Sequence, residues 1–401
     1  MNSEDKLLAS RFQQSIYYCS LLILFGLSLW LAASINAAEQ TSRGSAAIPN
    51  NGLPSLAAIK DCLKGTDSAE CLDNLFRAAL KNHSTVEALQ LVRRFEAEDP
   101  EFRRDCHPVV HAIGRETFQL KGNIHESFSA CDQTCHSGCY HGSVERFLRG
   151  DEIYSQTYKH PSQAELKQKA AAACDPNTPV RFRYQCLHGL GHAILFFSLY
   201  QLQSALDICD ALDEEWSRSS CYGGVFMENV SNASDERKNF SPTDYHAPCN
   251  QLADKYRQDC YIMQTSRMAE MGLSTERMLE ECAKAGVYRV ACTLSIGRDL
   301  SNEVRVGQPR TVARKCELVH GSSRRACMQG VVYALVDNTW DGRYAMPFCA
   351  AFASPTDREG CFETSIQYLR TFFEKPVEDI TRDCSRHAAD SPRCAELAVR
   401  Q

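Results

Sequence analysis

Two short stretches of this sequence place histidines four residues apart. Residues 107–114 read HPVVHAIG and residues 188–195 read HGLGHAIL, so both share the frame H-x-x-x-H-A-I. A third stretch, CYHGSVERFL from Cys139, has a histidine and a glutamate at the same spacing. Residues at i and i+4 project from one face of a helix, so the two members of each pair can share one metal ion without bending the helix.

These three pairs supply the predicted metal ligands, and imidazole and carboxylate groups bind Zn, Cu, Fe or Mn. We therefore expect a transition metal ion as the cofactor, with the identity of the metal left open. In two of the pairs the members lie two and six residues after a cysteine. The shared H-A-I frame gives the third pair the same offsets, counted from Asp105. The predicted ligands are His107, His111, His141, Glu145, His188 and His192.

The cysteines recur at regular intervals. The chain has 21 of them, and all but Cys19 lie outside an apolar N-terminal run. Sixteen form pairs whose members are 9 to 12 residues apart, and from residue 186 onward the second members follow one another at steps of 32 to 39 residues. A period near 34 is typical of arrays of helical hairpins. The pairs are Cys62/Cys71, Cys174/Cys186, Cys209/Cys221, Cys249/Cys260, Cys282/Cys292, Cys316/Cys327, Cys349/Cys361 and Cys384/Cys394.

The residues around these cysteines predict helices joined by a turn. Positions one, five and eight after the second cysteine are usually apolar and share one helical face. Most of the segments between the two cysteines are polar. The predicted fold is therefore an all-α solenoid of α/α helical hairpins with a period of about 34 residues, linked by disulfides within each repeat. Four cysteines break the pattern and allow three connectivities: Cys106, Cys131, Cys135 and Cys139.

Histidine is concentrated in the first repeats. Eight of the twelve histidines lie between residues 101 and 200, so the repeat itself does not require them. Gly142, Gly189 and Gly191 lie next to the paired histidines, where a missing side chain would let a neighbouring helix or a ligand approach. In the next repeat, Met227 and Glu228 follow the second cysteine by six and seven residues, and we expect them at the edge of the site.

The N-terminus predicts export. Residues 16–34 carry no charge, and nineteen helical residues span roughly 28 Å, close to the thickness of a bilayer core. Lys6 and Arg11 precede this hydrophobic helix, so the N-terminus should stay in the cytoplasm while the rest becomes periplasmic or extracellular. The helix is either a single-pass membrane anchor or a signal peptide that is cleaved. Twenty cysteines outside it are typical of an oxidising compartment.

We expect four regions: a cytoplasmic tail with signal anchor or signal peptide (1–38), a linker (39–55), a His-rich helical repeat section with the metal site (56–205), and regular Cys-paired repeats (206–401). The composition, 44% apolar and 23% charged, is that of a globular protein. The net charge of −6 and the lack of a basic run argue against a nucleic-acid partner. No common catalytic motif singles out a base or a nucleophile, so whether the chain is an enzyme is left open.

The predicted function is an exported transition-metal-binding helical repeat protein, which could be a metalloenzyme of unknown reaction. The alternative is a metal-free structural scaffold that binds a protein or peptide on its concave face, because H-x-x-x-H also occurs by chance. A second alternative rests on CDQTCH, residues 131–136, a lengthened form of C-x-x-C-H. In that case Cys131 and Cys135 would hold a covalent c-type haem, and His136 would be its axial ligand.

Overall fold

The structure is a computed structural model that describes residues 52–150, 161–231 and 239–400. Within these ranges the chain is helical and contains no strand. The expected hydrophobic helix at residues 16–34 and the boundary at residue 38 lie outside the described residues. No helix of the described part has the length and the apolar character needed to cross a bilayer.

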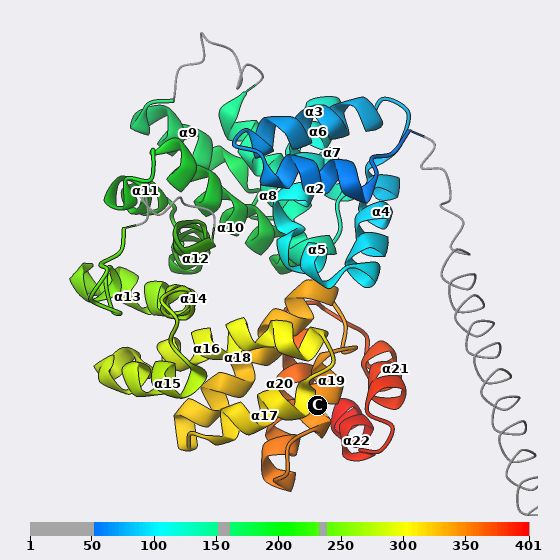
Figure 1. Cartoon of the computed structure of the whole chain (residues 1–401), viewed down its shortest axis with the longest axis vertical. Helices are drawn as coiled ribbons and strands as arrows, with labels where there is room; N and C mark the ends of the chain where they lie inside the picture. The colour runs from blue at the N-terminus through cyan, green and yellow to red at the C-terminus, as the bar shows by residue number, and fades with distance from the viewer. Residues whose placement is uncertain (1–51, 151–160, 232–238, 401) are drawn as a thin grey trace, which may run out of the picture. The chain divides into compact units, whose positions relative to one another are not determined.

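Most of the helices are short, and they pack on one another in sequence order (Figure 1). The described helices are α2 (Leu56–Lys64), α3 (Ser68–Ala79), α4 (Thr85–Glu98), α5 (Pro100–Asp105), α6 (His107–Lys121), α7 (Ile124–Ala130), α8 (Thr134–Arg149), α9 (Gln163–Ala173), α10 (Val180–Phe197), α11 (Leu202–Cys209), α12 (Glu215–Ser231), η1 (Cys249–Gln251), α13 (Asp254–Tyr261), α14 (Gln264–Glu270), α15 (Thr275–Lys284), η2 (Gly286–Tyr288), α16 (Arg289–Arg305), α17 (Pro309–Glu317), α18 (Gly321–Thr339), α19 (Ala345–Ala350), α20 (Pro355–Thr371), α21 (Val377–His387) and α22 (Arg393–Arg400).

Local sequence explains where these helices begin. Ser84 caps α4: its hydroxyl accepts a hydrogen bond from the backbone N–H of Glu87 at 3.2 Å, and the Glu87 carboxylate accepts from the backbone N–H of Ser84 at 2.7 Å. Such a capping box satisfies N–H groups that the first helical turn leaves without partners. Leu89 and Val92, one turn further on, are fully buried. The cap thus sets the start of the helix and the face that enters the core.

All twenty cysteines outside the N-terminal run are joined in disulfides. The eight pairs predicted from the spacing are confirmed, and each bridge spans 9 to 12 residues. The four irregular cysteines pair as Cys106–Cys135 and Cys131–Cys139. Closing a loop of about 12 residues stabilises a fold by about 3 kcal/mol, so the bridges compensate for the small core that short helix pairs can bury.

Glycines bring three pairs of helices into backbone contact: α6 with α8, α10 with α12, and α16 with α18. A Cβ built on any of six glycines would lie 1.9 to 2.1 Å from a carbonyl oxygen of the facing helix, which no side chain tolerates. The expected role of Gly142 and Gly191 is confirmed, and a Cβ on Gly189 would meet Cα of His141 at 2.9 Å. The glycine pairs are Gly114/Gly142, Gly191/Gly224 and Gly297/Gly330.

These helix crossings correct the alignment of the two histidine pairs that the shared H-A-I frame predicted. Gly142 faces the carbonyl of His111, Gly224 faces that of His188, and Gly330 faces that of Leu294. His111, not His107, therefore holds the place of His188, and the predicted alignment is wrong by one helical turn. The glycine that permits the backbone contact sets the register of each helix pair. His111 lies three residues before Gly114, and His188 lies three residues before Gly191. The offsets assigned to the pair in α6 are accordingly four residues too high.

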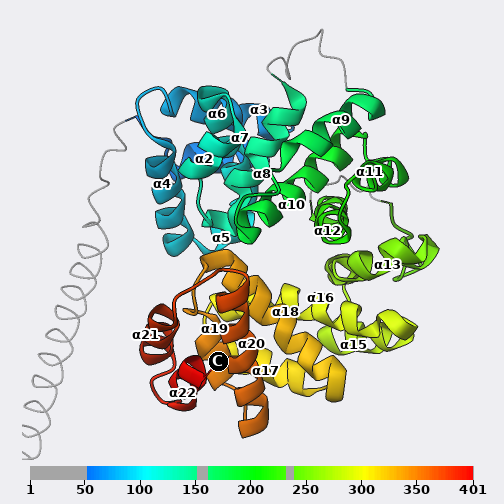
Figure 2. The same ribbon diagram turned by 180° about the vertical axis from the view of Figure 1, so that it is seen from behind.

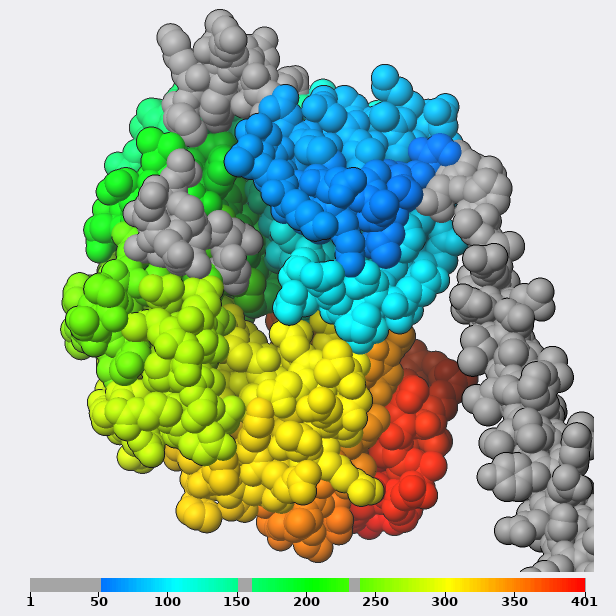
Figure 3. Space-filling view, in the orientation of Figure 1, coloured from blue at the N-terminus to red at the C-terminus, as the bar shows by residue number. Residues whose placement is uncertain are grey.

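Helices far apart in sequence also lie side by side. Arg305, at the end of α16, forms an ion pair with Glu96 of α4 at 3.1 Å, and its Nη1 lies 3.2 Å from Nε2 of His136 in α8. Arg181 of α10 donates to the backbone carbonyl of Phe373 at 2.9 Å. Helix α8 contacts α18. Figures 1 and 2 show α5 above the orange end of α18, and the space-filling view shows the cyan surface around α5 meeting the yellow and orange surface (Figure 3). These contacts join the His-rich helices to the later ones.

Candidate metal centre

Five histidine rings from α6, α8 and α10 form one cluster. His141 lies at its middle, with its ring centroid 5.5 Å from those of His107, His111 and His188 and 5.1 Å from that of His192. Four of the rings are at most 5% exposed, and only His107 is partly exposed. The histidines of the three predicted pairs are thus brought together by the packing of neighbouring helices.

Hydrogen bonds fix which nitrogen of His107 and His111 carries the proton. Nδ1 of His107 lies 2.8 Å from the backbone carbonyl of Cys135, and Nδ1 of His111 lies 2.7 Å from a carboxylate oxygen of Glu145. Both partners are acceptors, so each Nδ1 must donate. In the neutral rings, each Nε2 then bears a lone pair. Burial, followed by the nearby His111 ring, holds the pKa of His107 well below its ordinary value, so that ring stays neutral.

The two Nε2 atoms lie only 3.0 Å apart. Lone pairs at this distance repel unless a positive charge lies between or beside them. One ion with bonds of about 2.0–2.1 Å to two nitrogens would hold them about 2.9 to 3.4 Å apart, at angles between octahedral and tetrahedral. A ligand nitrogen of His141 completes the set, since one nitrogen from each of these three histidines lies within 4.8 Å of the other two. These three histidines can hold a metal ion.

Further ring nitrogens in the cluster have no hydrogen-bond partner. Nε2 of His141 lies 3.2 Å from Oε1 of Gln185, while its Nδ1 is buried and unpartnered. Nε2 of His192 is also buried without a partner. A buried nitrogen without a partner costs free energy, and these two nitrogens are therefore available to a further ligand.

Glu145 contacts two of its neighbours and is not among the three groups close enough to share an ion. Its second carboxylate oxygen accepts from Nη1 of Arg115 at 2.6 Å, and Arg115 also donates to Asp73 at 2.8 Å. Burial alone would raise the pKa of Glu145, but the neighbouring His111 and Arg115 side chains, which donate hydrogen bonds to it, outweigh burial and hold the pKa well below its ordinary value. Glu145 therefore stays ionised and orients His111 as a carboxylate behind a ligand does.

His192 has the same kind of support. Its Nδ1 lies 2.9 Å from Oε2 of Glu228, whose other oxygen accepts from the Tyr200 hydroxyl at 2.9 Å. The carboxylate makes Nδ1 the donor and leaves the lone pair on the unpartnered Nε2. Burial, together with the nearby His111 ring, lowers the pKa of His192 to about 3. The ring is therefore a neutral base with its lone pair available.

An unusual backbone segment delivers the carbonyl that holds His107. Cys135, His136 and Ser137 have φ values of 47°, 58° and 61°, the left-handed region that non-glycine residues seldom occupy. Such strain persists only where surrounding structure enforces it, and here the Cys106–Cys135 disulfide anchors the segment. The same disulfides oppose the haem alternative, because Cys131 is bonded to Cys139 and Cys135 to Cys106, so neither sulfur is available to a haem.

The pair α16 and α18 shows that this type of crossing does not need histidine. It repeats the glycine contacts of the two His-bearing pairs, yet Leu294 stands where they have His111 and His188. Arg298 stands where they have Arg115 and His192, which lie four residues after those histidines. The histidines are therefore an addition to the crossing and not a condition for it.

No pattern in the sequence predicted two of the residues of the site. Asp73, which is fully buried in α3, lies 42 residues before its partner Arg115. Gln185 comes one residue before Cys186 and belongs to no repeated motif. Met227 and Glu228, which the repeat offsets did indicate, contact His188 and His192 respectively.

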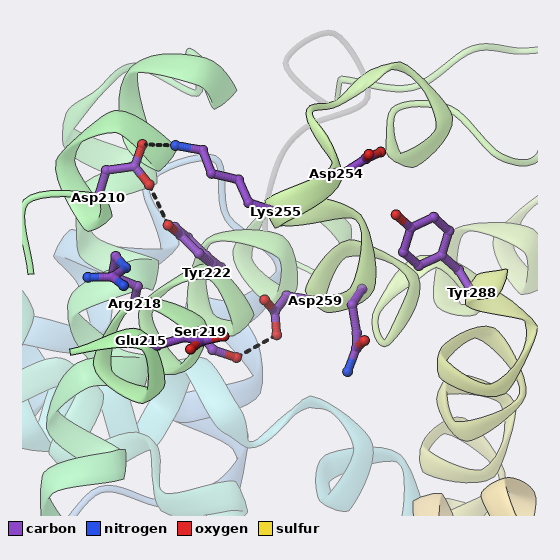
Figure 4. Close-up of a pocket in the computed structure, with 10 residues that line it drawn as sticks. Asp210, Glu215, Arg218, Ser219, Tyr222, Asp254, Lys255, Asp259 and Tyr288 are labelled. Carbon is purple, nitrogen blue, oxygen red and sulfur yellow. Dashed lines mark hydrogen bonds and ion pairs between the residues drawn. The ribbon is translucent and has the colours of Figure 1, made fainter.

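A polar cavity of about 520 Å³ lies elsewhere, between α12 and α13 (Figure 4). Several of the polar groups that line it form hydrogen bonds with one another. Asp210 accepts from Lys255 at 2.7 Å and from the Tyr222 hydroxyl, and Asp259 accepts from the Ser219 hydroxyl at 2.7 Å. Burial raises the pKa of Asp259 to about 6. The cavity thus has the character of a solvated polar recess, in contrast to the closed histidine cluster.

No protein-family model, no curated protein and no solved structure matches this chain. A function for the chain therefore has to be inferred from the chemistry of the histidine cluster.

Proposed function

We propose that this chain is an extracytoplasmic protein that binds a transition metal ion through Nε2 of His107, Nε2 of His111 and Nδ1 of His141. The observation that carries the proposal is the 3.0 Å separation of two Nε2 atoms whose rings both commit Nδ1 to an acceptor. A metal ion satisfies both lone pairs at once. It also satisfies the orphaned nitrogen of His141.

The ligand set favours certain metals. Three neutral imidazoles suit Zn, Cu or Fe, whereas Mn prefers oxygen ligands. Three protein ligands leave a fourth position, which a bound water or His192 could fill. With water there, the metal would supply Lewis acidity and a hydroxide nucleophile. With His192 there, the site is closed and the metal fastens α6, α8 and α10 together.

The setting of the site supports export and a repeat array. Ten disulfides fit an oxidising compartment, and the uncharged segment at residues 16–34 would direct the chain there as an anchor or a cleaved signal. The eight regular disulfides and the three equivalent glycine crossings support the α/α solenoid. Its concave face remains the proposed place for a protein or peptide partner.

A metal-free scaffold is the competing function. It would require a proton shared between the two Nε2 atoms in place of the metal. The histidine-free crossing of α16 and α18 argues against it, because a scaffold could use the same contacts without five histidines.

Elemental analysis of the full chain, purified without an affinity tag, tests the proposal. We expect about one equivalent of metal in the wild type and a loss of most of it in His107→Gln and His141→Gln. His246→Gln is the matched control, since His246 lies outside the cluster and contacts Tyr261. Circular dichroism and a count of free thiols establish that each variant is folded and bridged.

Metal content below about a tenth of an equivalent, even after anaerobic loading with Zn, Cu and Fe, would overturn the proposal. The scaffold function would then stand. Retention of the metal in both ligand variants would also overturn it, because the ion would then lie elsewhere.

A further inference from the structure

His188 faces a sulfur atom inside the cluster. Its Nε2 lies 3.4 Å from Sδ of Met227, and its ring is 3% exposed. Burial, followed by the nearby His192 ring, holds the pKa of His188 well below its ordinary value, so the ring is neutral. A neutral imidazole has one N–H and one lone pair.

Neither arrangement of that proton satisfies the ring. With the proton on Nε2, its acceptor is a thioether, which is weak, and the hydrogen bond that the ring donates to the Ser220 backbone is lost. With the proton on Nδ1, two lone pairs face each other across 3.4 Å. A cation between Nε2 and Sδ resolves the second arrangement. Bonds of about 2.0 Å to nitrogen and about 2.3 Å to sulfur place these atoms about 3.5 Å apart at a tetrahedral angle.

The helix crossings show that this pair is built like the first one. Because His188 holds the place of His111, Met227 of α12 holds the place of Glu145 of α8, each three residues after the facing glycine. In one crossing the histidine meets a carboxylate and in the other a thioether. The carboxylate of Glu145 orients a histidine ligand, whereas the thioether of Met227, at the equivalent position, can itself bind a soft metal ion.

We propose that His188 Nε2 and Met227 Sδ form a second metal subsite, specific for a soft monovalent ion, Cu(I). The unpartnered Nε2 of His192 is the third ligand, since that ring lies 5.0 Å from His188 and its Nδ1 is held by Glu228, which leaves the fourth position of the first centre to water. Thioether and imidazole donors with low coordination number select Cu(I) over Zn and Mn. The subsite extends the proposed metal-binding function and assigns copper to it.

X-ray absorption at the copper edge tests the subsite on the full chain loaded anaerobically with Cu(I). We expect a sulfur neighbour at about 2.3 Å in the wild type. Met227→Leu removes the sulfur at nearly constant volume, so it should abolish that signal and weaken Cu(I) binding at least tenfold. Met328→Leu, a change of another buried methionine, is the matched control and should leave both unchanged.

Loss of the first centre and loss of the subsite give different results. His107→Gln should leave the copper–sulfur signal in place, whereas Met227→Leu should leave the nitrogen-bound ion. A wild-type spectrum with nitrogen neighbours alone would overturn the subsite without touching the first centre. That spectrum needs no variant, so the proposal is tested even if Met227→Leu fails to fold. An unchanged sulfur signal in Met227→Leu would equally overturn it.

Discussion

Glu145 accepts a 2.7 Å hydrogen bond from Nδ1 of His111, and this bond decides which nitrogen of the ring is free. Without the carboxylate the ring could rotate or change tautomer. Glu145→Gln keeps the size of the side chain but removes its charge. Because partners behind a ligand typically contribute about 10–100-fold to affinity, we expect metal affinity to fall by that order.

A competition titration with a chromophoric chelator measures this affinity. Glu126→Gln is the control, because Glu126 is exposed at the start of α7 and forms hydrogen bonds with Asn123, away from the histidine cluster. Equal affinities for the two variants would contradict the orienting role of Glu145.

The glycine crossings allow stability and metal binding to be separated. Gly142→Ala would place a Cβ 2.0 Å from the carbonyl of His111, and Gly330→Ala would do the same to Leu294. Both should force their helices apart and lower the free energy of unfolding by about 1–3 kcal/mol or more. Only the first change moves α8 against α6, so only it should reduce metal content.

Chemical denaturation and elemental analysis of the two variants provide the measurements. Equal loss of metal in both variants would mean that the site responds to general destabilisation and not to local geometry.

Much of the fold could be predicted because cysteine spacing is a local property. A bridge of 9 to 12 residues closes one turn, so each regular pair could be read without knowing the rest of the fold. Cys106–Cys135 spans 29 residues and depends on how α6 meets α8, which no local pattern determines. The sequence therefore left three connectivities for these cysteines.

The sequence predicted which residues form the site, but it did not predict what each of them does there. Spacing identified the histidines, but the shared letters aligned His107 with His188, whereas the glycine contacts align His111 with His188. Glu145 was predicted as a ligand, and it lies against His111 and Arg115. Side-chain roles depend on atomic distances between helices, and sequence spacing does not encode them.

The Cys106–Cys135 disulfide should affect the metal site as well as stability. It anchors the segment whose Cys135 carbonyl accepts from Nδ1 of His107 at 2.8 Å. We expect the double change to alanine to lower the free energy of unfolding by about 3–4 kcal/mol, from its loop length, and to weaken metal binding. The same change at Cys349 and Cys361 should cost about 3 kcal/mol and leave metal binding unchanged. Chemical denaturation and chelator competition measure the two effects, and equal metal affinities in both double variants would contradict the link.

Asp337 makes the stability of the metal-free chain depend on pH. This carboxyl in α18 accepts a 2.7 Å hydrogen bond from the Tyr368 hydroxyl and faces Tyr184 and Tyr333 as well. Burial raises its pKa from 3.8 to about 7. Between these values the folded chain keeps a proton that the unfolded chain has lost. That proton therefore makes its full contribution to the free energy of unfolding below about pH 4, and the contribution disappears as the pH rises to about 7. The free energy of unfolding falls by up to about 1.4 kcal/mol per pH unit over this range.

Asp337→Asn removes this titration, so the stability of the variant relative to the wild type should increase from about pH 4 to about pH 7 and then stay constant. Urea denaturation of both proteins without metal, at several pH values from about 4.5 to about 8, measures the difference. Asp390→Asn, a change of an exposed carboxyl, is the control. A difference for Asp337→Asn that stays constant across the range would show that burial does not shift the titration of this carboxyl.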